Sequence, residues 1–526
     1  MGKKTKRKTS GGANSASSSS ASAQGSSGAS GGSGNKTRRA PALASVEANI
    51  ETLENLRFQD AEEDEFIEEE VVIDKDEEED DDNQGEVEQQ QQQQLGHDDD
   101  EDDDDKTNEP KVKEVWMPGG DIKEGEELEF DASAYTMYHA LKPEWPCLSF
   151  DIIRDSLGGS RSRFPHTVYC CAGTQAAEKG ANKLQLMKMS DLAKTYRKED
   201  NDEEDAEAMD SDTDDDEGDD NVHADPVLEH RDIKHYGCVN RLRSCPQKPA
   251  LIATHSETAH VHVYDLSPHL ASFDNRSGSA NLPQRPIFSH SGHREEGYAL
   301  DWSRVEAGMM LSGDCSGGIE LWNPRSELSS WEVTSGAWAA DHSVEDIQWS
   351  PSEKTVFAAG DCGGNVQIYD VRQRGKSMLC TRAHSTDVNV ISWNGIVTNL
   401  LASGADDGAF SVWDLRKFKE GVPLAKFTTS TKPITSVEWH PTDESMVVVT
   451  DEDACFIYDL SIEEDAEEAA KTSSLVPQGE NKIPPQLLFM HLGSTSNKEA
   501  HWHPQIPSCV MTTALTGFNV FIPSNL

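Results

Sequence analysis

The sequence predicts an all-β fold: a seven-bladed WD-repeat β-propeller, preceded by an N-terminal helix and a long disordered acidic N-terminal tail. The main observation is a tryptophan that recurs at intervals of 47, 44 and 46 residues between Trp302 and Trp439. Each of these four tryptophans stands 19 or 20 residues ahead of an aromatic residue followed by Asp or Asn. A period of about 40–45 residues with such a terminal pair is typical of WD-repeat blades. Seven blades need roughly 300 residues, so tails and insertions make up the rest of the 526-residue chain.

Alternating apolar residues and turn signals place the blades along residues 148–526. They are expected at about 148–192, 227–266, 287–322, 331–371, 379–415, 424–460 and 486–521. Arg243 stands at the tryptophan position of the second blade. Trp502 follows Trp439 by 63 residues, because residues 461–485 form an acidic insertion. A second acidic insertion occupies residues 199–220.

The fifth blade contains the polar residues that fasten a WD repeat internally. They fit a hydrogen-bonded tetrad in which a buried histidine bridges an acid and a serine to an indole: His384, Ser403, Asp407 and Trp413. The third blade has Ser316 and the fourth Gly363 at the acid position, so packing is expected to hold those blades. A Ser-His-Asp catalytic triad is the alternative. The structural role is favoured, because a triad needs an exposed serine beside an oxyanion hole.

Catalytic and metal-binding signatures are weak throughout the chain. His501 and His503 point to the same face of a strand, but no third ligand accompanies them, so a structural role is favoured over a metal site. The sequence has no Gly-rich phosphate loop and no zinc motif, and its carboxylates lie in solvated runs. We therefore expect no metal, no cofactor and no enzymatic activity.

Three segments precede the propeller. Residues 1–46 form a disordered Ser/Gly-rich tail whose basic cluster indicates a nuclear signal, with a solubilising tail or an organelle transit peptide as alternatives: Lys3, Lys4, Lys6, Arg7 and Lys8. Residues 47–115 are acidic, Gln-rich and disordered by composition. Residues 116–147 lead into the propeller and include a helix over 128–141 that the following Lys-Pro pair ends. One face of that helix is expected to carry Phe130, Tyr135, Tyr138 and Leu141.

The charge balance points to a basic protein partner. The net charge is −49, and such a field repels the phosphate backbone of nucleic acids. No apolar run approaches the roughly 20 residues that span a membrane, so no membrane or direct nucleic-acid contact is expected. Ten scattered cysteines without a CxxC pair indicate reduced thiols of a nuclear or cytosolic protein.

Several motifs resemble a known family. Glu-Trp-Pro-Cys-Leu-Ser-Phe at 144–150 is similar to the N-terminal segment of the histone-binding WD-repeat family, the retinoblastoma-binding and chromatin-assembly type. The Leu-Leu-Phe element within 485–491 and the His-Trp-His-Pro element within 498–507 resemble its glutamate-rich WD-repeat branch. Residues 237–243 and 513–518 fit the same branch.

The resemblance implies a protein of the nucleus and nucleolus that acts in ribosome biogenesis on pre-ribosomal particles. Members of this branch are chaperones for a newly made ribosomal protein of the large subunit, and some bind histones. In the histone-binding relatives, a basic client helix lies between the N-terminal helix and an acidic, proline-ended loop of blade six. The corresponding loop residues here are Glu463, Glu464, Asp465, Glu467, Glu468, Pro484 and Pro485.

Other functions stay open. The protein could be a histone-binding subunit of chromatin-assembly complexes, and the acidic runs could be merely solubilising. Arg372 and Arg416 end short Tyr-Asp-x-Arg and Trp-Asp-x-Arg patterns that also occur in substrate receptors of cullin-ring ubiquitin ligases, where they contact the adaptor. Ser211 and Thr213 precede acidic residues and suit an acid-directed kinase.

Overall fold

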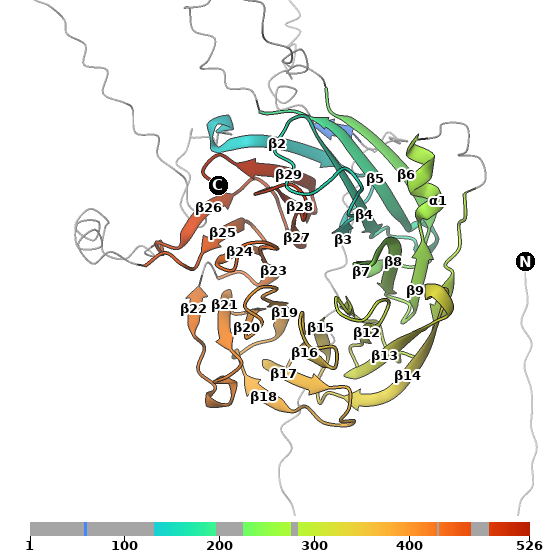
Figure 1. The fold of residues 1–526 in the computed structure, drawn as a ribbon, viewed down its shortest axis with the longest axis vertical. Helices are drawn as coiled ribbons and strands as arrows, with labels where there is room; N and C mark the ends of the chain where they lie inside the picture. The colour runs from blue at the N-terminus through green and yellow to red at the C-terminus, as the bar shows by residue number, and fades with distance from the viewer. Residues whose placement is uncertain (1–56, 60–130, 196–224, 275–281, 429–430, 464–482) are drawn as a thin grey trace, which may run out of the picture. The chain divides into compact units, whose positions relative to one another are not determined.

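Seven antiparallel sheets form a closed ring in the computed structural model (Figure 1). The structure describes residues 57–59, 131–195, 225–274, 282–428, 431–463 and 483–526. In these ranges the first strand of each blade lies nearest the centre of the ring, and later strands lie progressively outward (Figure 1). The prediction of a seven-bladed propeller is confirmed.

The first four blades each contain four strands in chain order. Blade one has β3 (Cys147–Ile152), β4 (His166–Thr174), β5 (Lys183–Leu192) and β6 (Val227–Lys234). Blade two has β7 (Val239–Cys245), β8 (Lys248–Ser256), β9 (Val261–Asp265) and β10 (Phe288–His290). Blade three has β11 (Ala299–Trp302), β12 (Met310–Gly313), β13 (Gly318–Arg325) and β14 (Ser330–Ala339). Blade four has β15 (Val344–Trp349), β16 (Val356–Asp361), β17 (Asn365–Asp370) and β18 (Leu379–Arg382).

The remaining blades complete the ring. Blade five has β19 (Val388–Trp393), β20 (Leu400–Ala405), β21 (Ala409–Asp414) and β22 (Ala425–Thr428). Blade six has β23 (Ile434–Trp439), β24 (Met446–Asp451), β25 (Cys455–Asp459) and β26 (Leu487–His491). Blade seven has β27 (Glu499–Trp502), β28 (Val510–Ala514), β29 (Gly517–Pro523), β2 (Tyr135–Lys142) and β1 (Arg57–Gln59). The helix α1 (Ser267–Asp274) lies between β9 and β10.

The predicted repeats are offset from the structural blades by one strand. The sequence repeat 227–266, for example, begins with β6, the outer strand of blade one, and continues with the three inner strands of blade two. Each repeat therefore spans two neighbouring blades. This overlap ties consecutive blades together covalently and leaves the last blade one strand short at the C-terminus.

The predicted N-terminal helix is wrong where the structure describes it. Residues 135–142 form β2, which pairs antiparallel with β29, and residues 132–134 form one turn of 3-10 helix. The apolar spacing of Tyr135, Tyr138 and Leu141 suits a helix, but Tyr135 and Met137 alternate as in a strand and both are buried. The unpaired edge of β29 decides between the two, because β2 satisfies its backbone groups and closes the ring.

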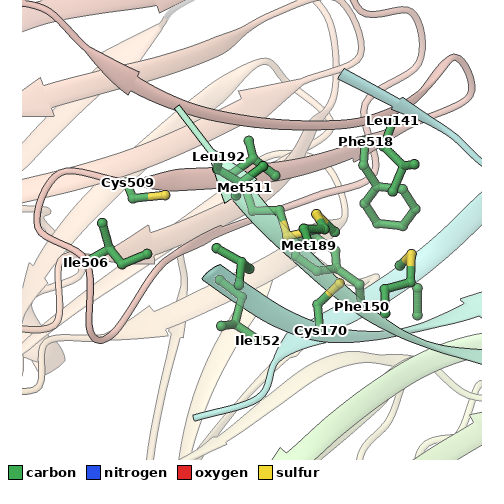
Figure 2. Packing of buried hydrophobic residues seen from close by; sticks show 14 of the residues in the cluster. Leu141, Phe150, Ile152, Cys170, Met189, Leu192, Ile506, Cys509, Met511 and Phe518 are labelled. Carbon is green, nitrogen blue, oxygen red and sulfur yellow. The ribbon is translucent and has the colours of Figure 1, made fainter. Parts of the chain in front are cut away.

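A hydrophobic cluster fills the junction between blade seven and blade one (Figure 2). Leu141 from β2 lies against Phe518 of β29, and Met511 of β28 lies close to the side chains from blade one. Those side chains include Phe150 and Met189, which are fully buried. The N-terminal strand therefore contributes to the core as well as to the sheet. All ten cysteines are described, and none of them forms a disulfide.

Hydrogen bonds also join the inner strands of neighbouring blades. The side chain before each blade tryptophan accepts from the backbone N–H of the tryptophan in the next blade. The distances are 2.7 Å for Trp349 to Asp301, 2.8 Å for Trp393 to Gln348, 3.2 Å for Trp439 to Ser392 and 3.0 Å for Trp502 to Glu438. In blade two the N–H of Ser244 donates to Asp151 in the same way, at 2.7 Å. Ser244 thus occupies the tryptophan position, and the assignment of Arg243 to it is wrong by one residue.

Candidate functional site

The tetrad residues of blade five are hydrogen-bonded to one another. His384 Nε2 lies 2.8 Å from Ser403 Oγ, and His384 Nδ1 lies 3.3 Å from Asp407 Oδ1. The indole N–H of Trp413 donates to the same Ser403 Oγ at 2.9 Å. Because Ser403 is fully buried and already shared by two partners, it lacks the access that a nucleophile needs.

Blade three has its own tetrad, contrary to the expectation that packing alone holds it. His293 bridges Ser312 at 2.7 Å and Asp314 at 3.1 Å, and Trp322 donates to Ser312 at 2.9 Å. Asp314 stands two residues after the serine, whereas Asp407 stands four residues after Ser403. An acid sought only at the blade-five spacing is therefore missed, although its carboxylate reaches the same histidine.

A buried carboxylate links the last blade to the first two. Glu499 of β27 is 1% exposed, and its Oε1 lies 2.8 Å from Arg241 Nη1 and 2.7 Å from Arg243 Nη2. Its Oε2 accepts from Ser149 Oγ at 2.8 Å and from the N–H of Phe150 at 2.9 Å. The pKa of Glu499 lies well below its usual range: burial raises it, but the charge of Arg243 and further cationic neighbours outweigh burial. This group fastens the ring where it closes.

His501 and His503 have structural partners. His501 Nδ1 lies 2.9 Å from Glu438 Oε2. Burial lowers the pKa of His501, but the nearby acids Glu438 and Glu499 outweigh burial and raise it to about 10, so the ring is a cation at neutral pH. His503 Nδ1 accepts from the N–H groups of Gln505 and Ile506 at 3.1 and 3.0 Å. Among the described residues, no group of three His, Cys, Asp or Glu side chains is arranged to hold a metal ion.

The predicted client-binding aromatic residues lie at the seam between blades six and seven. Tyr135 and Leu141 are 6% and 1% exposed, so the core holds them and a client cannot contact them. The Tyr135 hydroxyl lies 2.7 Å from His491 Nδ1, and its ring packs edge-on against Phe489. Tyr138 is only partly buried and is the one described aromatic of the predicted set that reaches the surface. Phe130 lies outside the described residues.

The acidic insertion 461–485 leaves and re-enters blade six beside this seam. It connects β25 to β26, and its two ends meet, since Gln486 Nε2 donates to the carbonyl of Ile462 at 2.7 Å. Glu463 and Pro485 are exposed, and Pro484 is partly buried. Glu464, Asp465, Glu467 and Glu468 lie outside the described residues, as do the basic cluster at 3–8 and the two candidate phosphorylation sites, Ser211 and Thr213.

A second acidic feature was not predicted. Carboxylates gather where inner strands begin and at the adjoining β20–β21 turn; this inner-strand acidic cluster comprises Glu296, Glu345, Asp387 and Asp406. Burial raises the pKa of Glu345, and the charges of Asp387 and Asp406 raise it further while Arg241 lowers it. Glu296 is exposed and the other three are partly exposed. The sequence signal was available, because Glu296 and Asp387 each stand six residues ahead of their blade tryptophan.

The two arginines of the short ligase-type patterns project from neighbouring blades. Arg372 follows β17 and forms an ion pair with Asp370. Arg416 follows β21, and its Nη2 lies 2.7 Å from Asp414 Oδ2. Both side chains are largely exposed, at 72% and 70%. Within the described ranges, no helix has the length and apolar character needed to cross a membrane.

The closed ring, its tetrads and its strand periodicity define the chain as a WD-repeat β-propeller. Residues 125–193 match the family of the histone-binding protein RBBP4 and its counterpart in the CAF1 complex, and residues 314–454 match the eukaryotic translation initiation factor eIF2A family. Three proteins are similar over most of their length. Protein HEAT STRESS TOLERANT DWD 1 of Arabidopsis thaliana is 44% identical over 78% of this chain and 92% of its own.

Ribosome assembly protein rrb1 of Schizosaccharomyces pombe is 40% identical over 77% of this chain and 84% of its own length. Glutamate-rich WD repeat-containing protein 1 of Dictyostelium discoideum is 41% identical over 78% of this chain and 85% of its own. The chain therefore belongs to the family of glutamate-rich WD-repeat and ribosome assembly proteins.

Proposed function

We propose that this chain is a non-catalytic scaffold of ribosome assembly that chaperones a basic client, a newly made ribosomal protein of the large subunit, in the nucleus and nucleolus. The inner-strand acidic cluster carries the proposal, because it gathers negative charge on a rigid framework. A free ribosomal protein is strongly basic and has extensions meant for RNA. Pre-organised carboxylates neutralise such extensions and speed the encounter.

The seam between blades six and seven is the proposed anchor site. Its surface residues are Tyr138, Glu463, Pro484 and Pro485. An aromatic side chain beside an acidic, proline-ended loop suits a short amphipathic client segment with apolar and basic residues. The remaining acids of the insertion would add long-range attraction. Membership of a family that includes the relative named ribosome assembly protein rrb1 supports this assignment.

Affinity purification of the full chain at low salt tests the proposal. One basic ribosomal protein should dominate the recovered material, and its yield should fall steeply between about 50 and 200 mM salt, because exposed charges are screened. A double substitution, Glu345→Gln with Asp406→Asn, should reduce recovery, whereas Glu332→Gln in an exposed ion pair of β14 serves as the matched control. Recovery of a stable complex without any basic protein contradicts the proposal.

Histone binding is a second candidate function, and the match of residues 125–193 to the histone-binding family supports it. The matched segment covers β2 to β5 and so includes Tyr138 at the seam. Competition on the purified chain separates the two functions. If the ribosomal client is the ligand, it should displace free histones at the lower concentration. Displacement of the ribosomal protein by histones at much lower concentration would favour chromatin assembly.

Adaptor binding in a cullin-ring ligase is a third candidate. The exposure of Arg372 and Arg416 on adjacent blades supports it, although each guanidinium is paired with an acid of its own motif. Arg416→Ala leaves the buried core untouched and should abolish co-purification of a ligase adaptor. Unchanged adaptor recovery, or none from the parent chain, removes this function.

A further inference from the structure

A basic pocket lies on blade one of this strongly acidic chain. The pocket has a volume of about 410 Å³, and the connection between β3 and β4 supplies its polar lining: Ser160, Arg161, Ser162, Arg163, His166 and Thr167. The described lining contains no carboxylate. In a chain with 96 acidic and 47 basic residues, two arginines beside three hydroxyl groups and a histidine form a local reversal of charge.

Blade seven holds the pocket wall in place. Gln505 Nε2 donates to the carbonyl groups of Asp155 and Gly158, both at 3.0 Å, and the N–H of Arg161 donates to the carbonyl of Gln505 at 2.9 Å. Arg161 Nη2 lies 3.0 Å from Asp155 Oδ2, which fixes the guanidinium. The donors are therefore positioned before any ligand arrives, which lowers the entropic cost of binding.

The pocket has a positive potential and an unused donor. Burial, and next the charge of Arg161, lower the pKa of His166 to about 4, so its ring is neutral at pH 7 and can donate one N–H. The nearby His503 has its pKa lowered to about 3 by burial and then by Arg161. Arg161 Nε is buried and has no hydrogen-bond partner among the described residues. A buried, unsatisfied cationic donor is a costly feature that an anionic ligand would relieve.

We propose that this pocket binds a phosphate monoester on an acidic peptide, and that the occupant is the chain's own insertion 199–220 phosphorylated at Ser211 or Thr213. A phosphate brings about two negative charges and three acceptor oxygens, which match Arg161 and Arg163. Long nucleic acids are disfavoured as occupants, because the net charge of −49 repels a continuous phosphate backbone.

The insertion is within reach of the pocket. It follows Thr195, whose N–H donates to the carbonyl of Thr136 at 3.1 Å, and the preceding Lys194 lies 5.5 Å above the ring of Phe164. Phe164 adjoins the lining residue Arg163 in the chain. Sixteen residues separate Thr195 from Ser211, and a flexible segment of that length has a root-mean-square span of roughly 20 Å. Tethering raises the effective concentration of the phosphate at the pocket.

Fluorescence anisotropy on the unphosphorylated full chain tests the binding site. The probe is a labelled peptide of residues 205–219 with phosphate on both hydroxyls. It should bind saturably, and the unphosphorylated peptide should bind at least about 10-fold more weakly, because the charge-assisted bonds are lost. Arg163→Glu, an exposed position, should weaken the phosphopeptide by at least about 10-fold. Arg374→Glu, exposed in the connection between β17 and β18, is the matched control and should leave affinity unchanged.

A second experiment identifies the occupant. Treating the full chain with an acid-directed kinase should block the labelled phosphopeptide, whereas a chain carrying Ser211→Ala and Thr213→Ala should still bind it after the same treatment. Absence of saturable binding, or equal binding by Arg163→Glu, overturns the pocket. Equal binding of the unphosphorylated peptide, or displacement by inorganic phosphate at the same concentration as by phosphopeptide, overturns the peptide-borne phosphate. Unblocked binding after phosphorylation overturns the insertion as the occupant.

Discussion

Replacing Glu499 by Gln should destabilise the propeller more than any single surface change. Glu499 Oε1 contacts Arg241 and Arg243, and Oε2 accepts from Ser149 Oγ and the N–H of Phe150. In Glu499→Gln one oxygen becomes an NH₂ group, which would face donors on either side. Loss of one or two buried hydrogen bonds costs about 1–3 kcal/mol. Two arginines would also lose the charge of their carboxylate, so the total should be about 3–5 kcal/mol, as for other broken buried ion pairs.

Urea unfolding, followed by tryptophan fluorescence, measures this loss. The exposed pair of Glu332 and Arg325 supplies the control, since Glu332→Gln should change the free energy of unfolding by less than about 0.5 kcal/mol. The effect of Glu499→Gln also depends on pH. Because the folded-state pKa of Glu499 is depressed below its ordinary 4.5, its stabilisation is present above about pH 4.5 and is lost as pH falls further. A loss under about 1 kcal/mol at pH 7, or one that persists unchanged at pH 3, refutes the reasoning.

Three further changes test the fastening groups. Asp314→Ala should cost about 3 kcal/mol and Asp407→Ala about 1 kcal/mol in urea unfolding, because Asp314 is buried and accepts more backbone N–H bonds; the reverse order contradicts this. Burial raises the pKa of Asp301 to about 7, so its contribution to stability falls as pH rises from about 4 to 7, and Asp301→Asn should gain on the parent by up to ~4 kcal/mol across that window; parallel pH profiles exclude it. Tyr135→Phe should lower the free energy of unfolding by about 1–2 kcal/mol, because His491 loses its partner; an unchanged midpoint opposes a role in ring closure.

Local patterns were sufficient to predict the blades and one tetrad. The tryptophan intervals identify seven repeats, because each blade needs the same buried indole at the same strand position. The spacing of His384, Ser403 and Asp407 indicated their hydrogen bonds, because all three lie within one blade. Asp314 escaped the same search, since its carboxylate reaches His293 from a different position in the strand-connecting turn.

Residues 135–142 show why the candidate site was harder to predict. Their apolar positions fit helical and strand periods alike, and only the open edge of β29 selects the strand. The choice moves Tyr135 and Leu141 into the core and leaves Tyr138 at the surface. The inner-strand acidic cluster was overlooked because its members come from different blades, and each alone is an ordinary loop acid.

The sequence by itself determined the repeat, the number of blades, the acidic insertions and the family resemblance. These properties depend on residues that are close in the chain or that recur at a constant period. Only the tertiary structure decided that β2 completes blade seven, that Glu499 joins three blades, and that Arg161 and His166 line a basic pocket. Each of these depends on closing the ring, which brings residues about 350 positions apart into hydrogen-bond contact.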